Sequence, residues 1–297
     1  MIRQILQDFL AHSDFARAGA VITDLDGTAL HENNGRISIA KPVELGLKRL
    51  YDLGRPFVLN SLRSPDSVLR NFGRDWYSIS NAPIPAVTLN GSLLGYVTQN
   101  AAREITFEEL ATFPLLPAEI DAALDGVAKL IADGVHDLLL FYYPRRWQAG
   151  ENIWTPAAPR VPEIQQKHRN AKSITAWEPC RLRAHLHSQD ICMILLQHTG
   201  RDNVLTRAGI DKLSGAQRIA SQLHFDLASS IGAGDTDMDQ FLSAVGLAIL
   251  VGGFPLDFQG RFATLRLNNS LELGELFFQA ASLLEQEPHQ DILTPDS

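Results

Sequence analysis

The sequence predicts an α/β protein that is built on a parallel sheet and interrupted by an inserted domain. Over the first 91 residues, apolar strand-like runs alternate with helical patterns, which is typical of a parallel sheet with crossover helices. The pattern then changes to a mixture of strand-like runs, helices and a proline-rich loop until about residue 205, and the alternation resumes after it. We therefore predict a core of residues 1–91 and 206–297, with residues 92–205 inserted as an α+β domain.

The predicted elements of the first part follow from hydrophobic spacing. Gly54 stands where a glycine ends a helix, and the pair Asn90-Gly91 marks a turn after a strand. The predicted elements are an amphipathic N-terminal helix over residues 2–10, strands over 19–23, 56–60 and 86–89, and helices over 40–53 and 67–72.

The later elements are predicted in the same way. The sequence predicts a helix over residues 117–132. It predicts a loop over residues 154–162, because this segment is rich in proline. The remaining predictions are strands over 137–143, 190–197, 227–232 and 247–251, helices over 214–223 and 271–287, and a polar tail over 288–297.

Composition narrows the classes of partner. The chain has 297 residues, of which 45% are hydrophobic, and no window approaches 18 consecutive apolar residues, so we expect no membrane partner. The net charge of −8 argues against a nucleic-acid partner. Cys180 and Cys192 lack the spacing of a zinc or redox pair and are expected to be buried thiols. A reducing cytoplasm is the default compartment, and the oligomeric state stays open.

Two carboxylates follow the first predicted strand. Asp24 and Asp26 lie two residues apart, so strand alternation would send them to the same side. Ligands bind at the carboxyl ends of the strands in an open parallel sheet. Paired carboxylates at this position are costly unless a cation neutralises them, and oxygen ligands of this kind suit Mg²⁺. The alternative is a pair of surface carboxylates in a loop.

A second acidic segment, GAGDTDMD over residues 232–239, also follows an apolar strand. Its glycines allow a tight turn, and its carboxylates are Asp235, Asp237 and Asp239. A calcium loop is a poor alternative, because the segment lacks the twelve-residue ligand register.

Two further residues between these acidic segments suit phosphate binding. Ser61 follows the second predicted strand, so its hydroxyl should lie at the same sheet edge as Asp24. Lys212 precedes a predicted helix, and an ammonium there can neutralise phosphate charge. Taken singly, Ser61 would be a helix cap and Lys212 a surface charge; their order along the chain favours the functional interpretation.

In this order, the segments resemble the four motifs of the haloacid dehalogenase superfamily of phosphatases, in its Cof-like, type IIB branch. That resemblance implies a Rossmann-like core with a cap inserted after the third strand. The matching segments are residues 21–28, 57–63, 209–216 and 234–239, and residues 88–92 look like the branch's exit into the cap.

The resemblance also implies a chemistry. It implies an Mg²⁺-dependent phosphatase in which Asp24 is the nucleophile and Asp26 the general acid and base. The substrate would be a small phosphorylated metabolite, with sugar phosphates favoured. The implied phosphate-binding residues are Ser61, Leu62, Arg63 and Lys212, and the implied metal-site residues are Asp24, Asp26, Asp235 and Asp239. Asp239 would either ligate the metal or orient Lys212.

The chain departs from the family pattern at two positions. Leu62 stands where a glycine is usual, which keeps a backbone N–H but stiffens the loop, and Met238 stands where an asparagine is usual. These departures motivate an alternative, a homologue that binds phosphorylated ligands or a partner protein with little turnover. Another alternative is a disaccharide-phosphate phosphatase of the sucrose-, trehalose- or mannosylglycerate-phosphate type.

The inserted segment is rich in basic residues in its second half. Arg181 and Arg183 lie two apart, so in a strand they would share one face and could recruit a polyanionic or phosphosugar substrate. The alternative is a solvated charged surface.

Overall fold

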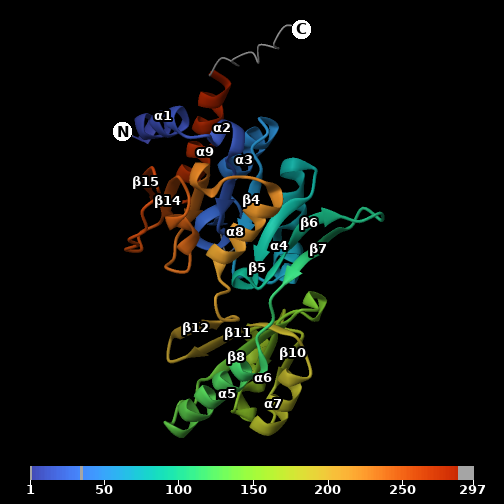
Figure 1. The fold of residues 1–297 in the computed structure, drawn as a ribbon. Helices are drawn as coiled ribbons and strands as arrows, with labels where there is room; N and C mark the ends of the chain where they lie inside the picture. Colours follow the sequence, from blue (N-terminus) through green and yellow to red (C-terminus); the bar gives the residue numbers. More distant parts are fainter. Residues whose placement is uncertain (1, 34–35, 287–297) are drawn as a thin grey trace. The chain divides into compact units, whose positions relative to one another are not determined.

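The computed structural model of the chain describes residues 2–33 and 36–286, which fall into two compact units (Figure 1). Unit 1 comprises Met1–Phe57 and Leu223–Ser297, and unit 2 comprises Val58–Gln222. The chain passes from one to the other within strand β4 (Phe57–Asn60) and again at the end of helix α8 (Lys212–Leu223). The predicted tail over residues 288–297 and residue 287 of the last predicted helix lie outside the described residues. The predicted boundaries at residues 91 and 205 stay predictions.

The strands of unit 1 form a parallel sheet, as predicted. The strand order is β15-β14-β13-β1, and each neighbouring pair is parallel. These strands are β1 (Val21–Thr23), β13 (Ile231–Gly234), β14 (Leu247–Val251) and β15 (Ala263–Leu267). The first three are buried along their whole length, as expected for strands covered on both faces.

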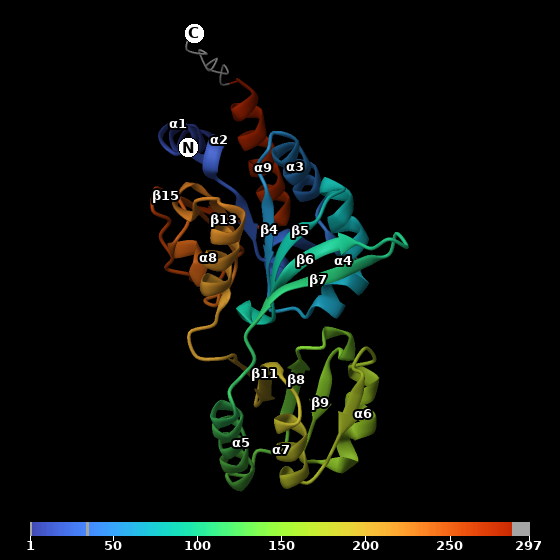
Figure 2. The ribbon, with the colours of Figure 1, turned by 45° about the vertical axis from the view of Figure 1, so that its right-hand side comes forward.

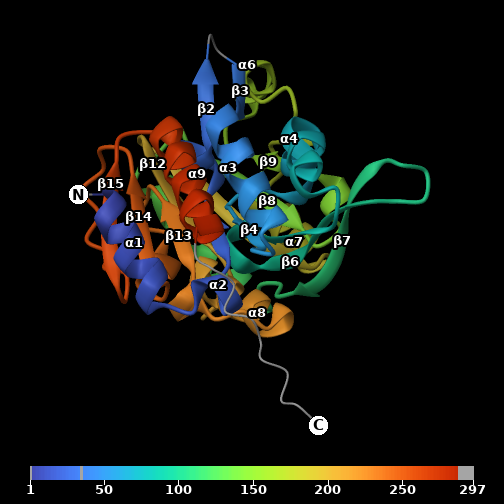
Figure 3. The same cartoon turned by 90° about the horizontal axis from the view of Figure 1, so that it is seen from above.

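Two helices of unit 1 pack against each other at Gly46 and Gly274. They are α3 (Lys41–Asp52) and α9 (Ser270–Gln286), which lie side by side in Figure 3. A Cβ on Gly46 would lie 2.6 Å from the Cβ of Phe277, so only glycine fits this contact. The other elements of unit 1 are α1 (Ile2–His12), α2 (Phe15–Ala18) and an antiparallel pair, β2 (Leu30–Asn33) and β3 (Arg36–Ile39).

Unit 2 begins with a mixed sheet in the order β4-β5-β6-β7. Strand β5 (Ile84–Thr88) is parallel to β4, whereas β6 (Leu93–Gln99) and β7 (Ile105–Thr112) are antiparallel. Helix α4 (Pro65–Ser80) contacts β7 and is longer than the predicted 67–72. It starts earlier because the Ser64 side chain caps it, accepting a hydrogen bond from the Ser67 N–H.

A second sheet of unit 2 has the order β10-β9-β8-β11-β12. Its strands are β8 (Leu139–Pro144), β9 (Asn152–Trp154), β10 (Ser173–Thr175), β11 (Ile191–His198) and β12 (Arg201–Leu205). Helices α5 (Pro117–Ala132) and α7 (Pro179–His187) contact each other on one face (Figure 2), and α6 (Val161–Lys167) precedes β10. Leu140 and Tyr142 of β8 join the core beneath α5 and α7.

Besides the bounds of α4 and the loop over 154–162, where β9 ends at Trp154 and α6 begins at Val161, three local predictions are wrong. Strand β13 starts at Ile231 rather than at residue 227, because Asp226 accepts a hydrogen bond from the Ala228 N–H and holds Leu227–Ser229 in a 3-10 turn. Arg181 and Arg183 lie on helix α7, not on a strand. Cys180 is exposed, although Cys192 is a buried thiol whose pKa burial raises to about 12.

Among the described residues, no helix combines the length and the apolar character needed to cross a bilayer.

Candidate functional site

Three carboxylates meet in unit 1. Asp24, Asp235 and Asp239 each offer an oxygen, and these atoms lie within 4.8 Å of one another. Asp24 and Asp239 are buried, with 5% and 0% of their surface exposed. Three carboxylates so close and so poorly solvated repel one another unless a cation neutralises them. The structure therefore brings together three of the four predicted metal-site residues in an arrangement that can hold a divalent cation.

Asp24 follows directly on β1, which fixes its backbone. Its N–H donates to the Ala233 carbonyl at 2.9 Å, and its own carbonyl accepts from Thr23 Oγ1 at 2.8 Å. The argument from strand alternation does not hold for Asp26, because β1 ends at Thr23 and residues 25–29 form an irregular helical turn. Asp26 is exposed, and its side chain is outside the three-carboxylate cluster.

Gly27 is required for the approach of Asp235. Its φ of +72° is in the left-handed region, and a Cβ there would lie 2.6 Å from Asp235 Cγ. Asp235 is oriented by Thr28, whose Oγ1 donates to Asp235 Oδ1 at 3.1 Å. Thr28 is fully buried and was not singled out from the sequence as a site residue.

Asp239 is held by its own loop. Its Oδ2 accepts hydrogen bonds from the Asp235 N–H at 2.9 Å and from the Thr236 N–H at 3.0 Å. A Cβ on Gly234 would lie 2.6 Å from Asp239 Cγ, so this glycine leaves room for the carboxylate. Asp237, in contrast, is exposed and outside the cluster. Asp235 and Asp239 are therefore the two carboxylates of this segment that come close to Asp24.

Unit 2 holds the residues predicted to bind phosphate, beginning with the loop after β4. Ser61 is 1% exposed, and its Oγ accepts a hydrogen bond from the Arg63 N–H at 3.1 Å. The loop after β5 fixes this loop through its backbone: the Leu89 N–H donates to the Arg63 carbonyl, and the Asn90 N–H to the Ser61 carbonyl. Leu89 and Asn90 adopt φ of 50° and 54°, a left-handed conformation that costs free energy for leucine.

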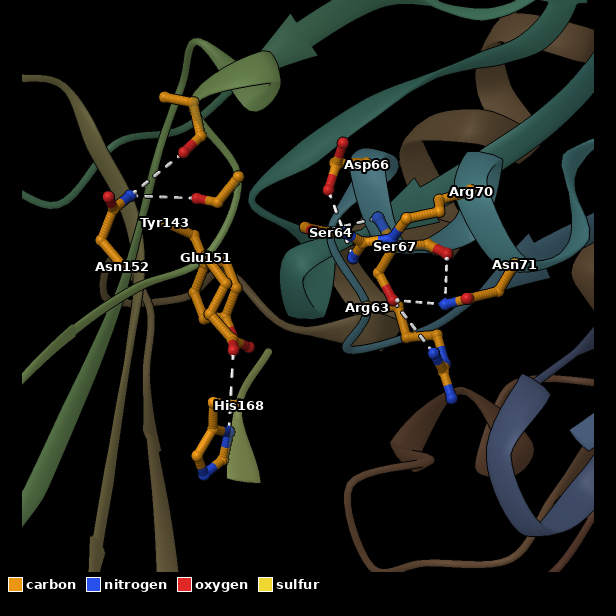
Figure 4. A network of polar contacts seen from close by, with 12 residues as sticks. Arg63, Ser64, Asp66, Ser67, Arg70, Asn71, Tyr143, Glu151, Asn152 and His168 are labelled. Atoms are coloured by element: carbon orange, nitrogen blue, oxygen red, sulfur yellow. Dashed lines mark hydrogen bonds and ion pairs between the residues drawn. The ribbon is translucent and has the colours of Figure 1, made fainter. Parts of the chain in front are cut away.

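The side chain of Arg63 extends along the start of α4 (Figure 4). Its Nη1 donates to Ser67 Oγ at 3.0 Å, and its guanidinium lies 5.1 Å from the ring centre of Phe72. Leu62, the neighbouring residue, is half-buried.

Lys212 is a buried lysine, with 2% of its surface exposed. The reading as a surface charge is therefore wrong. Its carbonyl accepts a hydrogen bond at 3.0 Å from Nδ2 of Asn60, which is fully buried on β4. The start of α8 is capped by Asp211 Oδ1, which accepts from the Ser214 N–H at 2.7 Å. Asn60 was not singled out from the sequence.

The predicted site residues thus fall into two groups, each described within its own unit. Unit 1 holds the carboxylates, and unit 2 holds Ser61, Leu62, Arg63 and Lys212. That the two groups act on one substrate stays a prediction.

The basic residues of the segment 145–183 are largely engaged within unit 2. Arg145 pairs with Glu109 at 2.8 Å, and Arg183 pairs with Asp121 and Asp125 of helix α5. Arg181 lies over the ring of Trp177, 4.8 Å from its centre. These contacts weaken the interpretation of Arg181 and Arg183 as a pair that recruits substrate.

No protein-family model and no curated protein sequence matches the chain. Solved structures do match it. BT1666 of Bacteroides thetaiotaomicron, described among phosphatases of the haloalkanoate (HAD) enzyme superfamily, is 12% identical with a TM-score of 0.64, covering 91% of this chain and 96% of that one. BT4131, a sugar phosphatase of HAD subclass IIB, is 13% identical with a TM-score of 0.61, covering 87% and 96%.

A third solved structure, described as a HAD/COF-like hydrolase from Plasmodium vivax, is 14% identical with a TM-score of 0.64, covering 94% of this chain and 98% of that one. TM-scores of 0.61 to 0.64 over nearly the whole length of each protein show a shared fold, and identities of 12% to 14% show no more than the fold. The chain therefore has the fold of the haloacid dehalogenase superfamily.

Proposed function

We propose that this protein is an Mg²⁺-dependent phosphatase of the haloacid dehalogenase superfamily, in its Cof-like branch. It hydrolyses a small phosphorylated metabolite. The observation that carries the proposal is the cluster of Asp24, Asp235 and Asp239, whose ligand oxygens lie within 4.8 Å of one another.

The cluster fits Mg²⁺ by the chemistry of its donors. Mg²⁺ prefers oxygen ligands and is commonly held by one or two carboxylates together with substrate phosphate and water. Asp24, Asp235 and Asp239 would hold it, together with the backbone carbonyl of Asp26. The ion would supply positive charge where the anionic nucleophile and the phosphate approach each other.

In the proposed reaction, Asp24 acts as nucleophile. Its carboxylate attacks phosphorus and forms an aspartyl phosphate as the bond from phosphorus to the leaving oxygen breaks. Asp26 donates a proton to that oxygen and then takes a proton from the water that hydrolyses the aspartyl phosphate. The exposure of Asp26 suits this exchange of protons, because an acid and base that works twice must reach both leaving group and water.

The phosphate is held by unit 2 in this proposal. The Ser61 hydroxyl, the Leu62 N–H and the side chains of Arg63 and Lys212 would contact its oxygens. The burial of Lys212 supports this role, because an ammonium in a buried site interacts more strongly with phosphate charge than one in water. Residues 92–205 would act as a cap that excludes water between the two steps.

A sugar phosphate is the substrate class that we favour. This preference rests on the match to BT4131, which is described as a sugar phosphatase of subclass IIB. The test is a panel of phosphorylated metabolites, assayed for phosphate release with Mg²⁺ and after removal of divalent cations by a chelator. We expect release from one or more sugar phosphates, restored by Mg²⁺ after chelation. No release from any member of the panel in either condition would contradict the proposal.

A further inference from the structure

A polar cluster of three residues in unit 2, outside the groups assigned above, joins β8 to the residue before β9 and the residue after α6. Tyr143 Oη donates to Glu151 Oε2 at 2.7 Å, and His168 Nδ1 lies 3.9 Å from Glu151 Oε1 (Figure 4). Tyr143 follows Tyr142 on β8, so it faces away from the core beneath α5 and α7. The side chains of Glu151 and His168 remain 30% and 29% exposed. A ligand can therefore reach this carboxylate, although its phenol partner is largely buried.

The turn that carries Glu151 is fixed before any ligand arrives. Gly150 has a φ of +61°, and a Cβ on it would lie 2.7 Å from Lys172 Cγ. The Glu151 carbonyl accepts from the Lys172 N–H at 2.8 Å, and Asn152, the next residue, accepts from Ser173 Oγ at 2.8 Å. Such second contacts preorganise a binding group, because less conformational entropy is lost when the ligand binds.

The cluster lies within electrostatic reach of the loop after β4. Burial raises the pKa of Tyr143, the charge of Glu151 raises it further, and the positive charge of Arg63 opposes both. Arg145, just beyond β8, also pairs with Glu109 of β7 at 2.8 Å, which ties the two sheets of unit 2 together. The cluster and the predicted phosphate-binding loop thus belong to one compact unit.

We propose that Glu151, oriented by Tyr143, and His168 bind the hydroxyl groups of a phosphorylated polyol, and so select the part of the substrate that is not phosphate. This inference rests on the proposed phosphatase function. A carboxylate accepts hydrogen bonds from hydroxyls, and imidazole can donate to them or accept from them. Charged acceptors give the stronger hydrogen bonds.

Other ligand groups fit this cluster less well. The negative charge of Glu151 repels a second phosphate, which disfavours bisphosphates. An ammonium group would pair with Glu151, but the positive charge of Arg63, which acts on the adjacent Tyr143, disfavours a cation there. Neutral hydroxyls meet neither repulsion.

The test compares Glu151→Gln with wild type on two substrates, a hexose phosphate and an aryl phosphate that has no hydroxyls. The measured quantity is the ratio of kcat/KM for the hexose phosphate to that for the aryl phosphate. We expect this ratio to fall about tenfold to a hundredfold in Glu151→Gln, as for loss of a hydrogen bond to a charged group. Tyr143→Phe should lower the ratio less, because it only loosens the orientation of the carboxylate.

Glu163→Gln is the matched control, because it is the same substitution on helix α6. Glu163 pairs with Lys167, and its side chain is 53% exposed. It should leave the ratio unchanged. An unchanged ratio in Glu151→Gln would overturn the inference. Thermal unfolding of each variant shows whether a loss reflects misfolding.

Binding separates this inference from the proposed function. If wild type released no phosphate from either substrate, calorimetry with the same two compounds would still decide. Weaker binding of the hexose phosphate relative to the aryl phosphate in Glu151→Gln would support the inference while the phosphatase proposal failed. Equal relative affinities in wild type and variant would overturn it.

Discussion

Unit 1 and unit 2 each contain an acidic site, and the two are built in opposite ways. In unit 1, three carboxylates come within 4.8 Å of one another, and two of them are buried. In unit 2, a single carboxylate, Glu151, is partly exposed and already accepts a hydrogen bond from Tyr143. Three carboxylates so close together repel one another and favour binding of a cation. One carboxylate beside a phenol and an imidazole can instead accept hydrogen bonds from neutral donors.

The backbone around the two sites differs accordingly. Gly27 and Gly234 leave room for carboxylates to approach in loops that follow parallel strands. Glu151 stands in the connection between two antiparallel strands, β8 and β9. Parallel strands are better suited to gathering several side chains, because their carboxyl ends meet at one edge.

The largest effect is expected at the nucleophile. Asp24→Asn should lower phosphate release by more than about a thousandfold, as when a nucleophile is removed in other enzymes, because an amide cannot form the acyl phosphate. Asp237→Asn, in the same acidic region but exposed and outside the cluster, is the control and should stay close to wild type. Steady-state phosphate release measures both. Near-normal turnover in Asp24→Asn would remove the distinction between the two acidic sites.

The cation requirement is tested next, through Asp235. Mg²⁺ should raise the unfolding temperature of wild type, because a ligand that binds only the folded state stabilises it. Asp235→Asn should weaken Mg²⁺ affinity about tenfold to a hundredfold, the size of effect seen when groups around a metal are removed. Thermal unfolding across an Mg²⁺ titration gives the affinity, with Glu151→Gln as the comparison from unit 2. An equal shift in both variants would mean that the sites do not differ in their need for a cation.

A moderate effect is expected at Asn60. Asn60→Ala removes the hydrogen bond to the buried Lys212 carbonyl and should lower the free energy of unfolding by about 1–3 kcal/mol. Phosphate release should also fall, because Lys212 would lose part of its support. Asn71→Ala, which removes an exposed amide on α4, serves as control. Urea unfolding that showed equal losses in both variants would contradict the role given to Asn60.

The smallest effect concerns a surface carboxylate of unit 2. His187, followed by Arg183, lowers the pKa of Asp121, so its contribution to stability is present above the unfolded pKa of about 3.9 and is lost as pH falls below it. Asp121→Asn should therefore lower the urea midpoint slightly at pH 7 and leave it unchanged at strongly acidic pH. Asp133→Asn, at the end of the same helix, controls for the change of charge. A difference that persists in acid would show that the carboxylate charge is not its cause.

Long, strongly patterned elements could be predicted from the sequence. The apolar run Leu247–Val251 and the helix Pro117–Ala132 have the predicted bounds, because each is set by a clear hydrophobic pattern. Short polar segments could not. Helix α7 was missed because Pro179 begins it and only nine residues carry its period, and Asp226 turned a predicted strand start into a 3-10 turn.

Candidate site residues could be named from the sequence where their charge singles them out within a motif, as for Asp24, Asp235 and Asp239. Thr28 and Asn60 lie inside two of the matching segments but were not named, because their hydrogen-bond partners Asp235 and Lys212 lie 207 and 152 residues away along the chain. Nothing in the residue types alone says that such hydrogen bonds form.

Two hydrogen bonds between the loops after β4 and β5 bear on which substitutions this protein can accept. The Leu89 N–H donates to the Arg63 carbonyl and the Asn90 N–H to the Ser61 carbonyl, so neither bond depends on the side chain at position 62. The conformation of the Ser61 loop therefore depends on Leu89 and Asn90 of the neighbouring loop, which adopt the left-handed conformation. A substitution at position 62 should therefore leave these two hydrogen bonds intact, whereas a substitution at Leu89 or Asn90 that disfavours a positive φ should disturb them.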